Sequence, residues 1–172
     1  VMHAFGSFVP VGGVLVQQDF KSWLPWLFLH MWQLRDHFEP VHDVPGGTIG
    51  FVRRSNTHSE ALWTQQSFPC QRFDEVWDAV EASWKGFGSG QAALHAAMAR
   101  GRHAIMIGRA EHGVECFERA NAQRRTVFNR PELDPWRTPF DGIWADALVT
   151  MRRGLIKAGS NSTAVERAAK VA

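Results

Sequence analysis

Tyrosine is absent from this 172-residue sequence, although it holds eight Trp and twelve Phe. Lysine is also scarce, with four Lys against fifteen Arg. Trp, Arg, Gly and Ala are encoded by G/C-rich codons, whereas Tyr and Lys are encoded by A/T-rich ones. The skew therefore favours an origin in the coding genome over a functional one, and it excludes no class of function.

Cysteine is scarce as well: the sequence contains two, Cys70 and Cys116. Two cysteines are too few for a disulfide framework, and they do not form a CxxC pair that would hold a metal or a redox centre. We expect two buried thiols in preference to one disulfide bridge.

A large charge of either sign is missing too. The net charge is +2, which is too small to indicate polyanion binding by itself. Residues 1–99 carry six basic and nine acidic side chains, whereas residues 100–172 carry thirteen and eight. The hydrophobic share of 45% and the charged share of 21% are typical of a folded domain, and the length suits one domain.

Residues 22–34, SWLPWLFLHMWQL, form an uncharged run too short to cross a membrane. As a helix they would extend about 20 Å, against about 30 Å of hydrocarbon. The run would be apolar nearly all round, so it must be covered on most sides. We expect its large side chains to meet a partner protein or lipid: Trp23, Trp26, Leu27, Phe28, Met31 and Trp32.

The sequence begins at Val1 and shows no basic-then-apolar signal segment. Removal of a targeting segment would suit import into mitochondria. This is the basis for expecting a location at the mitochondrial inner membrane.

Catalytic and cofactor motifs are missing: the sequence contains neither GxxxxGK[ST], GxGxxG, GxSxG nor HExxH. His30, His37 and His42 match no known zinc-ligand spacing. His112 and Cys116 would share a helical face, where an imidazole could activate a thiol. A buried structural thiol is the favoured interpretation, and we predict no metal and no cofactor.

The clearest helical signal lies between Pro69 and Pro131, an interval without proline. Apolar residues recur from Phe73 to Phe87 at helical spacing, and the GFGSG segment would end that helix. A second, long helix is predicted toward Phe128. It contains Gly101, Gly108 and Gly113, which each cost about 1 kcal/mol inside a helix and so indicate close packing, a bend or a break.

The predicted fold is mainly α, with a helix-turn-helix core, a third amphipathic helix and an extended aromatic N-terminal arm. Residues 1–18 are interpreted as an extended arm or weak hairpin around Gly12 and Gly13, and residues 48–52 as a short strand. The third helix is expected at residues 140–158, and the tail after it adds a short helix or frays. The expected division is a 1–38 arm, a 39–72 irregular connector and a 73–172 helical domain.

These features favour a non-catalytic accessory or scaffolding subunit of a larger assembly. The reasons are the surplus aromatic surface in residues 1–38 and the absence of catalytic motifs. Exposed apolar patches normally mark interaction sites. Other protein subunits are the expected partners, with peripheral membrane or lipid contact in addition. A respiratory-chain or ATP-synthase type of complex is the expected setting.

Two alternatives remain open. An RNA-binding or ribosomal protein would use the Arg-rich segment 100–130, in which Arg102, Arg109 and Arg124 could contact phosphates. Acidic residues interrupt this segment, so a helix face with ion pairs is favoured. A small helical enzyme would use His112 and Cys116.

Overall fold

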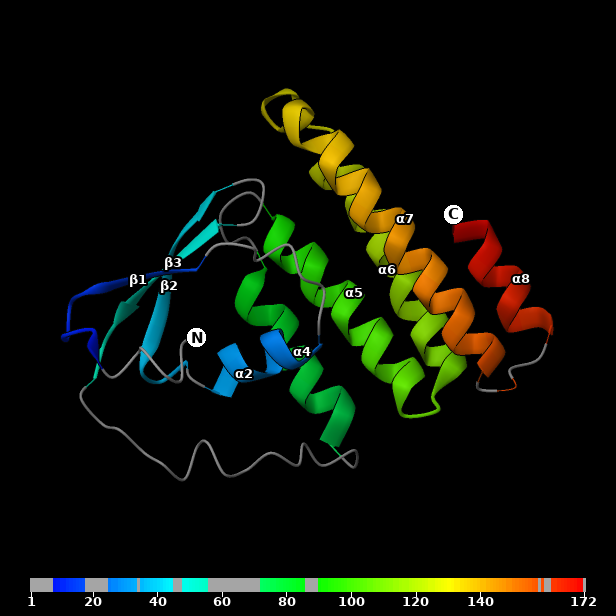
Figure 1. Cartoon of the computed structure of the whole chain (residues 1–172), viewed down its shortest axis with the longest axis horizontal. Coiled ribbons are helices and arrows are strands. Elements are labelled where there is room, and N and C mark those ends of the chain that lie inside the picture. The colour runs from blue at the N-terminus through cyan, green and yellow to red at the C-terminus, as the bar shows by residue number, and fades with distance from the viewer. Residues whose placement is uncertain are drawn as a thin grey trace.

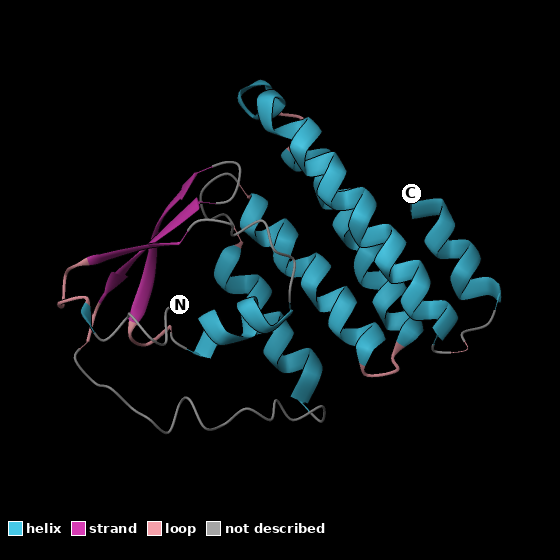
Figure 2. Cartoon of the chain, in the orientation of Figure 1, coloured by secondary structure: helices cyan, strands magenta, loops and turns pink. Residues whose placement is uncertain are grey.

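The computed structural model describes residues 8–17, 25–33, 35–44, 48–55, 72–85, 90–157, 159 and 162–171. Within them, a small antiparallel sheet lies at one end and a set of helices extends away from it (Figures 1 and 2). The predicted mainly α fold is confirmed. The strands are β1 (Val14–Gln17), β2 (Phe38–Val44) and β3 (Thr48–Arg53), and the helices are α2 (Pro25–Gln33), α4 (Phe73–Trp84), α5 (Gln91–Met106), α6 (Ala110–Val127), η3 (Pro131–Leu133), α7 (Asp134–Lys157) and α8 (Ser162–Val171).

The sheet has the order β1-β3-β2, so β3 is its central strand. The turn predicted at Gly12 and Gly13 is present: Gly12 has a φ of +84°, and the Gly13 N–H donates to the Pro10 carbonyl at 2.8 Å. The strand after this turn pairs with β3, placing Val16 opposite Gly50. The prediction of a weak hairpin within residues 1–18 is therefore corrected to a longer-range pairing.

The predicted strand at residues 48–52 is confirmed as β3. The wider prediction of an irregular connector at 39–72 is wrong over residues 39–53, because β2 and β3 form an antiparallel pair there. Pro40 did not prevent this pairing, since β2 is an edge strand and the register shifts between Pro40 and His42.

Helix α5 is the centre of the molecule, with thirteen of its sixteen residues buried. Its small side chains allow elements to pack on both sides. Ala92, Ala96 and Ala99 contribute to a core with the sheet, α2 and α4. Leu94 and Met98 contribute to a second core with α6, α7 and α8.

The long helix predicted toward Phe128 is a helical hairpin. Gly108 takes a left-handed φ of +85° and ends α5, and α6 then runs back along it (Figure 1). A Cβ on Gly101 would lie 2.8 Å from the Phe117 ring, and one on Gly113 would lie 2.9 Å from the Gly101 carbonyl oxygen. Two of the predicted glycine roles, close packing and a break, are thus both present.

The third predicted helix begins earlier than residue 140. Helix α7 begins at Asp134, although Pro139 lies inside it. Phe140, Trp144, Ala147, Met151 and Leu155 are buried in the second core. Burial of this stripe sets the position of the helix, so Pro135 and Pro139 are accommodated near its N-terminal end. The tail forms α8.

Candidate functional site

The aromatic helix predicted to be a partner surface lies inside the molecule where the structure describes its side chains. Phe28 is fully buried and Met31 is 5% exposed. The Phe28 ring packs edge-on against Trp84, with ring centroids 6.4 Å apart. The expectation that Phe28 and Met31 meet a partner is therefore wrong, because α4, α5 and the sheet cover this face of α2.

The other predicted residues of this helix differ in position. Leu27 and Trp32 are half-buried and pack against the same core. The Arg35 guanidinium lies 4.1 Å from the centre of the Trp32 ring, a cation–π contact. Trp23 and the side chain of Trp26 lie outside the described residues, so their role at an interface stays a prediction.

Exposed apolar surface is found on the sheet side of the molecule instead. Along β1, Val14 is 55% exposed and Val16 is 62% exposed, while Leu15 between them packs against the core. Upstream of the strand, Phe8 is 80% exposed and Val11 is 48% exposed. The alternation in β1 puts both valines on the outer face of the sheet.

The register extends this outer face across the sheet. Val14 lies opposite Val52 of β3, and Val16 lies opposite Gly50. Gly50 has no side chain to cover Val16. On the edge strand β2, Val41 is 43% exposed. Among the described strands, β1 pairs with β3 alone, so one of its two edges has no strand beside it. We call Val14, Val16 and Val52 the outer sheet face.

The sequence does not predict this exposed face, because the strand that supplies it is only four residues long. The VLV segment after Gly13 is apolar throughout, so it lacks the polar–apolar alternation that would show which side of the strand faces solvent. Its partner strand lies more than thirty residues away. The all-apolar composition of so short a strand was the only available signal, and it indicates burial on both faces.

The second chemically distinctive region is a buried charged junction between α4, α5 and α6. The Arg100 side chain is 4% exposed, and its guanidinium donates to Asp78 at 2.7 Å, to Asp74 at 3.0 Å and to Glu81 at 3.2 Å. Burial lowers the pKa of Arg100, but the hydrogen bonds with Asp78 and Asp74 outweigh it and the pKa is raised. Arg100 is therefore permanently charged and holds α4 against α5.

Asp74 joins this junction to α6. Arg109 donates to its Oδ2 at 2.9 Å, and the Nε2 atom of His112 lies 3.1 Å from its Oδ1. Burial raises the pKa of Asp74, but hydrogen bonds from Arg109 and Arg100 outweigh it and the pKa is lowered. His112, a predicted catalytic candidate, thus faces an acidic side chain of the junction.

The other catalytic candidate, Cys116, is 1% exposed. Burial raises the pKa of its thiol, and the Arg119 guanidinium, 3.4 Å from Sγ, offsets this only in part. A protonated, buried thiol is a poor nucleophile. Its polar neighbour is Arg119 and not His112, so the geometry counts against a Cys–His pair.

The predicted arginine stretch is largely engaged within the chain. Besides Arg100 and Arg109, Arg124 donates to Asp141 of α7 at 3.0 Å and lies over the Trp144 ring. These three side chains join neighbouring helices through ion pairs. The predicted ion pairs along one helix face are thus corrected, for these arginines, to ion pairs between helices.

Within the described residues, no group of three or more His, Cys, Asp and Glu is arranged to hold a metal ion. None of the helices in the described part of the chain is both long and apolar enough to cross a membrane.

Comparison with known proteins adds no assignment: no protein-family model, curated protein or solved structure matches the chain.

Proposed function

We propose that this chain is a non-catalytic accessory or scaffolding subunit of a larger protein assembly, and that its outer sheet face contacts a partner subunit. The observation that carries the proposal is the exposure of Val14 and Val16 on an edge strand. Exposed edge strands with apolar side chains favour pairing with another chain, and proteins usually avoid them unless they are used.

The proposed contact is the addition of a strand from the partner subunit beside β1. Main-chain hydrogen bonds would give affinity, and the partner's alternate side chains would pack beside Val14 and Val16. Phe8 and Val11 lie just before β1 in the chain and would extend the apolar contact. In this proposal the charged junction and the Cys116 thiol both have structural roles. Burial raises the pKa of the thiol, which supports such a role for Cys116.

Native co-purification with two matched variants tests this proposal. The V14K/V16K variant adds two positive charges to the outer sheet face, whereas V149K adds one at a valine of α7 that is 47% exposed. We expect the wild-type chain and V149K to retain the same stoichiometric partner, and V14K/V16K to lose it while remaining folded. Loss of the partner in V149K as well, or retention in V14K/V16K, would contradict the proposal.

Location is a separate part of the proposal. We place the assembly at the mitochondrial inner membrane, in a respiratory-chain or ATP-synthase type of complex, and fractionation of the native source tests this. Co-migration of the chain with inner-membrane complexes is expected, and recovery from another compartment would contradict it.

A further inference from the structure

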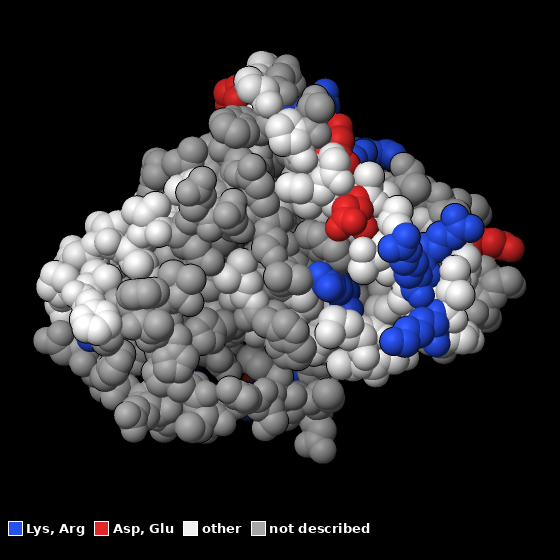
Figure 3. All heavy atoms as spheres, viewed as in Figure 1, with Lys and Arg blue, Asp and Glu red and all other residues white. Residues whose placement is uncertain are grey.

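The C-terminal half of α7 carries a surface on which every charged side chain is basic. The acidic residues of this helix all precede Ala147. Beyond that point, Arg152, Arg153 and Lys157 are exposed. Figure 3 shows basic side chains gathered on the face of the molecule that includes this part of α7. The charge of the helix therefore changes sign along its length.

The three basic side chains are not engaged within the described part of the chain. No ion pair or side-chain hydrogen bond joins them to another described residue. Arg124 and Arg167, by contrast, form ion pairs with acidic side chains of neighbouring helices. The helix dipole favours Lys157 in the last turn, but its effect falls off within that turn and does not reach Arg152. The three positive charges are thus available to an external anionic partner.

An exposed apolar side chain lies among the basic ones. Ile156 is 62% exposed. At about 100° per residue, Arg152 lies on one side of Ile156 around the helix, and Arg153 and Lys157 lie on the other. We call Arg152, Arg153, Ile156 and Lys157 the basic face of α7. Long basic side chains in this position can reach lipid headgroups while the apolar side chain between them enters the boundary of the acyl chains.

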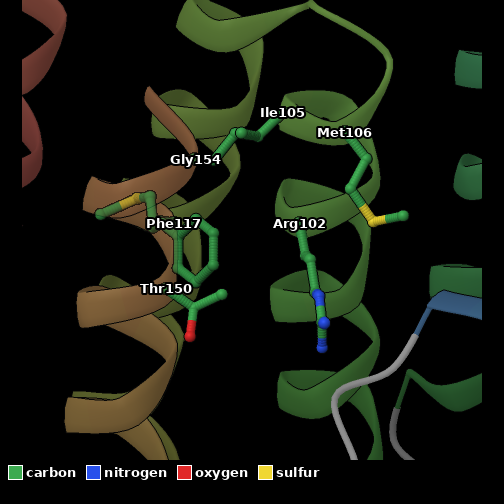
Figure 4. Close-up of a pocket in the computed structure, with 7 residues that line it drawn as sticks. Arg102, Ile105, Met106, Phe117, Thr150 and Gly154 are labelled. Atoms are coloured by element: carbon green, nitrogen blue, oxygen red, sulfur yellow. The ribbon is translucent and has the colours of Figure 1, made fainter. Parts of the chain in front are cut away.

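Further apolar surface lies beside the basic face. An apolar pocket of about 220 Å³ separates this part of α7 from α5. Figure 4 shows Thr150 and Gly154 on the side of α7 that faces α5, and Arg153 and Lys157 each lie three residues beyond them. Met106 of α5, which lines the same pocket, is 54% exposed. Apolar surface therefore continues beyond the basic face on the side of α5.

We propose that the basic face of α7 docks on an anionic lipid surface, with its three cations at the headgroup phosphates and Ile156 at the boundary of the acyl chains. Charge complementarity carries this choice, because anionic headgroups attract basic side chains within about a Debye length. A nucleic acid could pair with the same cations, but its phosphates would leave Ile156 without an apolar contact. The inference goes beyond the proposed subunit contact: it concerns another face, and either can fail without the other.

Flotation of the full chain with lipid vesicles tests the proposal, because vesicles float and separate bound protein from any aggregate. Vesicles of phosphatidylcholine with about 30% phosphatidylglycerol provide the anionic surface, and pure phosphatidylcholine vesicles are the neutral control. We expect binding to the anionic vesicles to be at least about tenfold tighter than binding to the neutral ones, and to weaken as salt is added.

Two triple variants separate the basic face from the net charge of the chain. R152Q/R153Q/K157Q should weaken binding to the anionic vesicles roughly 100-fold, because each basic side chain near such a surface contributes about fivefold. K85Q/R125Q/R130Q removes three charges at exposed positions outside α7 and should change binding by less than about threefold. Both variants lower the net charge of +2 by three.

A variant of Ile156 tests the apolar part of the contact. I156Q keeps every charge of the basic face and should weaken binding to the anionic vesicles about tenfold. I156W should bind at least as tightly as the wild type, because indole side chains favour the lipid interface. The circular dichroism spectra of all variants should match that of the wild type, since the substituted side chains are exposed.

The proposal would be overturned by absence of binding to anionic vesicles, by equal binding to neutral ones, by equal losses in the two triple variants, or by unchanged binding in I156Q. Tighter binding to a single-stranded RNA oligonucleotide than to vesicles, unaffected by I156Q, would assign the face to nucleic acid instead. Loss of a co-purifying subunit in R152Q/R153Q/K157Q, with flotation unchanged, would assign it to a protein.

Discussion

The indole N–H of Trp77 donates a 3.0 Å hydrogen bond to Nδ1 of His103, and both side chains are buried between α4 and α5. An indole nitrogen can only donate, so Nδ1 must accept and the imidazole must be neutral. Burial lowers the pKa of His103 in agreement with this geometry.

This pair predicts how stability depends on pH. Below the ordinary His pKa of 6.5, the unfolded chain binds a proton at residue 103 that the folded chain does not bind. The free energy of unfolding should therefore fall as the pH is lowered below that value, until the lowered folded pKa is reached. Urea denaturation between about pH 5 and about pH 7.5 measures this fall, which should be smaller in H103Q. Equal pH dependence in the two proteins would contradict the prediction.

The charged junction makes a second prediction. R100Q removes a buried guanidinium and its hydrogen bonds to Asp74 and Asp78, so it should lower the free energy of unfolding by about 2–3 kcal/mol. R125Q is the control, because Arg125 is exposed on α6 and its loss should change stability by less than about 0.5 kcal/mol. Similar effects of the two substitutions in urea denaturation would show that the junction does not stabilise the packing of α4.

The charged junction also predicts how acid unfolds the protein, because it includes Asp74. The pKa of Asp74 is lowered in the folded chain, so its contribution is present above the ordinary value of 3.8 and is lost as the pH falls through the folded pKa. In D74N the acid limb of the unfolding curve should therefore be shallower than in the wild type. An unchanged acid limb would show that Asp74 is paired equally in the unfolded chain.

The helix pattern could be read from sequence, but the way the helices pair could not. The apolar series of α4 is local, and Phe73, Val76, Trp77, Val80 and Trp84 are buried as their spacing predicts. The reversal at Gly108 depends on a φ of +85°, which sequence indicates only as one option among several. Close approach of α5 and α6 at Gly101 and Gly113 depends on both helices together.

The prediction that Phe28 and Met31 of the aromatic helix meet a partner is wrong because it, too, depended on how distant elements pack. An all-apolar helix is equally suited to a partner and to a chain's own core, and periodicity alone cannot distinguish them. Phe28 and Met31 are covered by α4, α5 and a sheet built from strands far apart in sequence. The sequence predicts residues 1–18 as a separate arm, and this prediction omits the surface that β1 supplies to the core.

The glycine contacts between α5 and α6 give a fourth prediction. In G113A the added Cβ would lie 2.5 Å from Cγ1 of Ile105 and 2.9 Å from the Gly101 carbonyl oxygen. The helices must then move apart, at a cost of about 1–3 kcal/mol. G142A, where a Cβ meets nothing within 4 Å, should stabilise the protein by about 0.4–1 kcal/mol. Thermal denaturation of both variants checks the opposite signs, and a stabilised G113A would contradict the packing.

The buried thiol gives a fifth prediction. In a C70S background, Cys116 should react with a thiol reagent at pH 8 only as fast as the chain opens, since it is 1% exposed and burial raises its pKa. Unfolding in urea should speed the reaction at least about tenfold. Fast labelling of the folded protein would support the alternative in which Cys116 is a nucleophile.

Light scattering on the isolated chain during size-exclusion chromatography tests most directly whether the outer sheet face needs a covering partner. We predict a mass above that of the 19.4 kDa monomer for the wild type, or aggregation, and a monomer for V14K/V16K. V149K should behave as the wild type. A wild-type chain that elutes as a well-behaved monomer, indistinguishable from V14K/V16K, would contradict it.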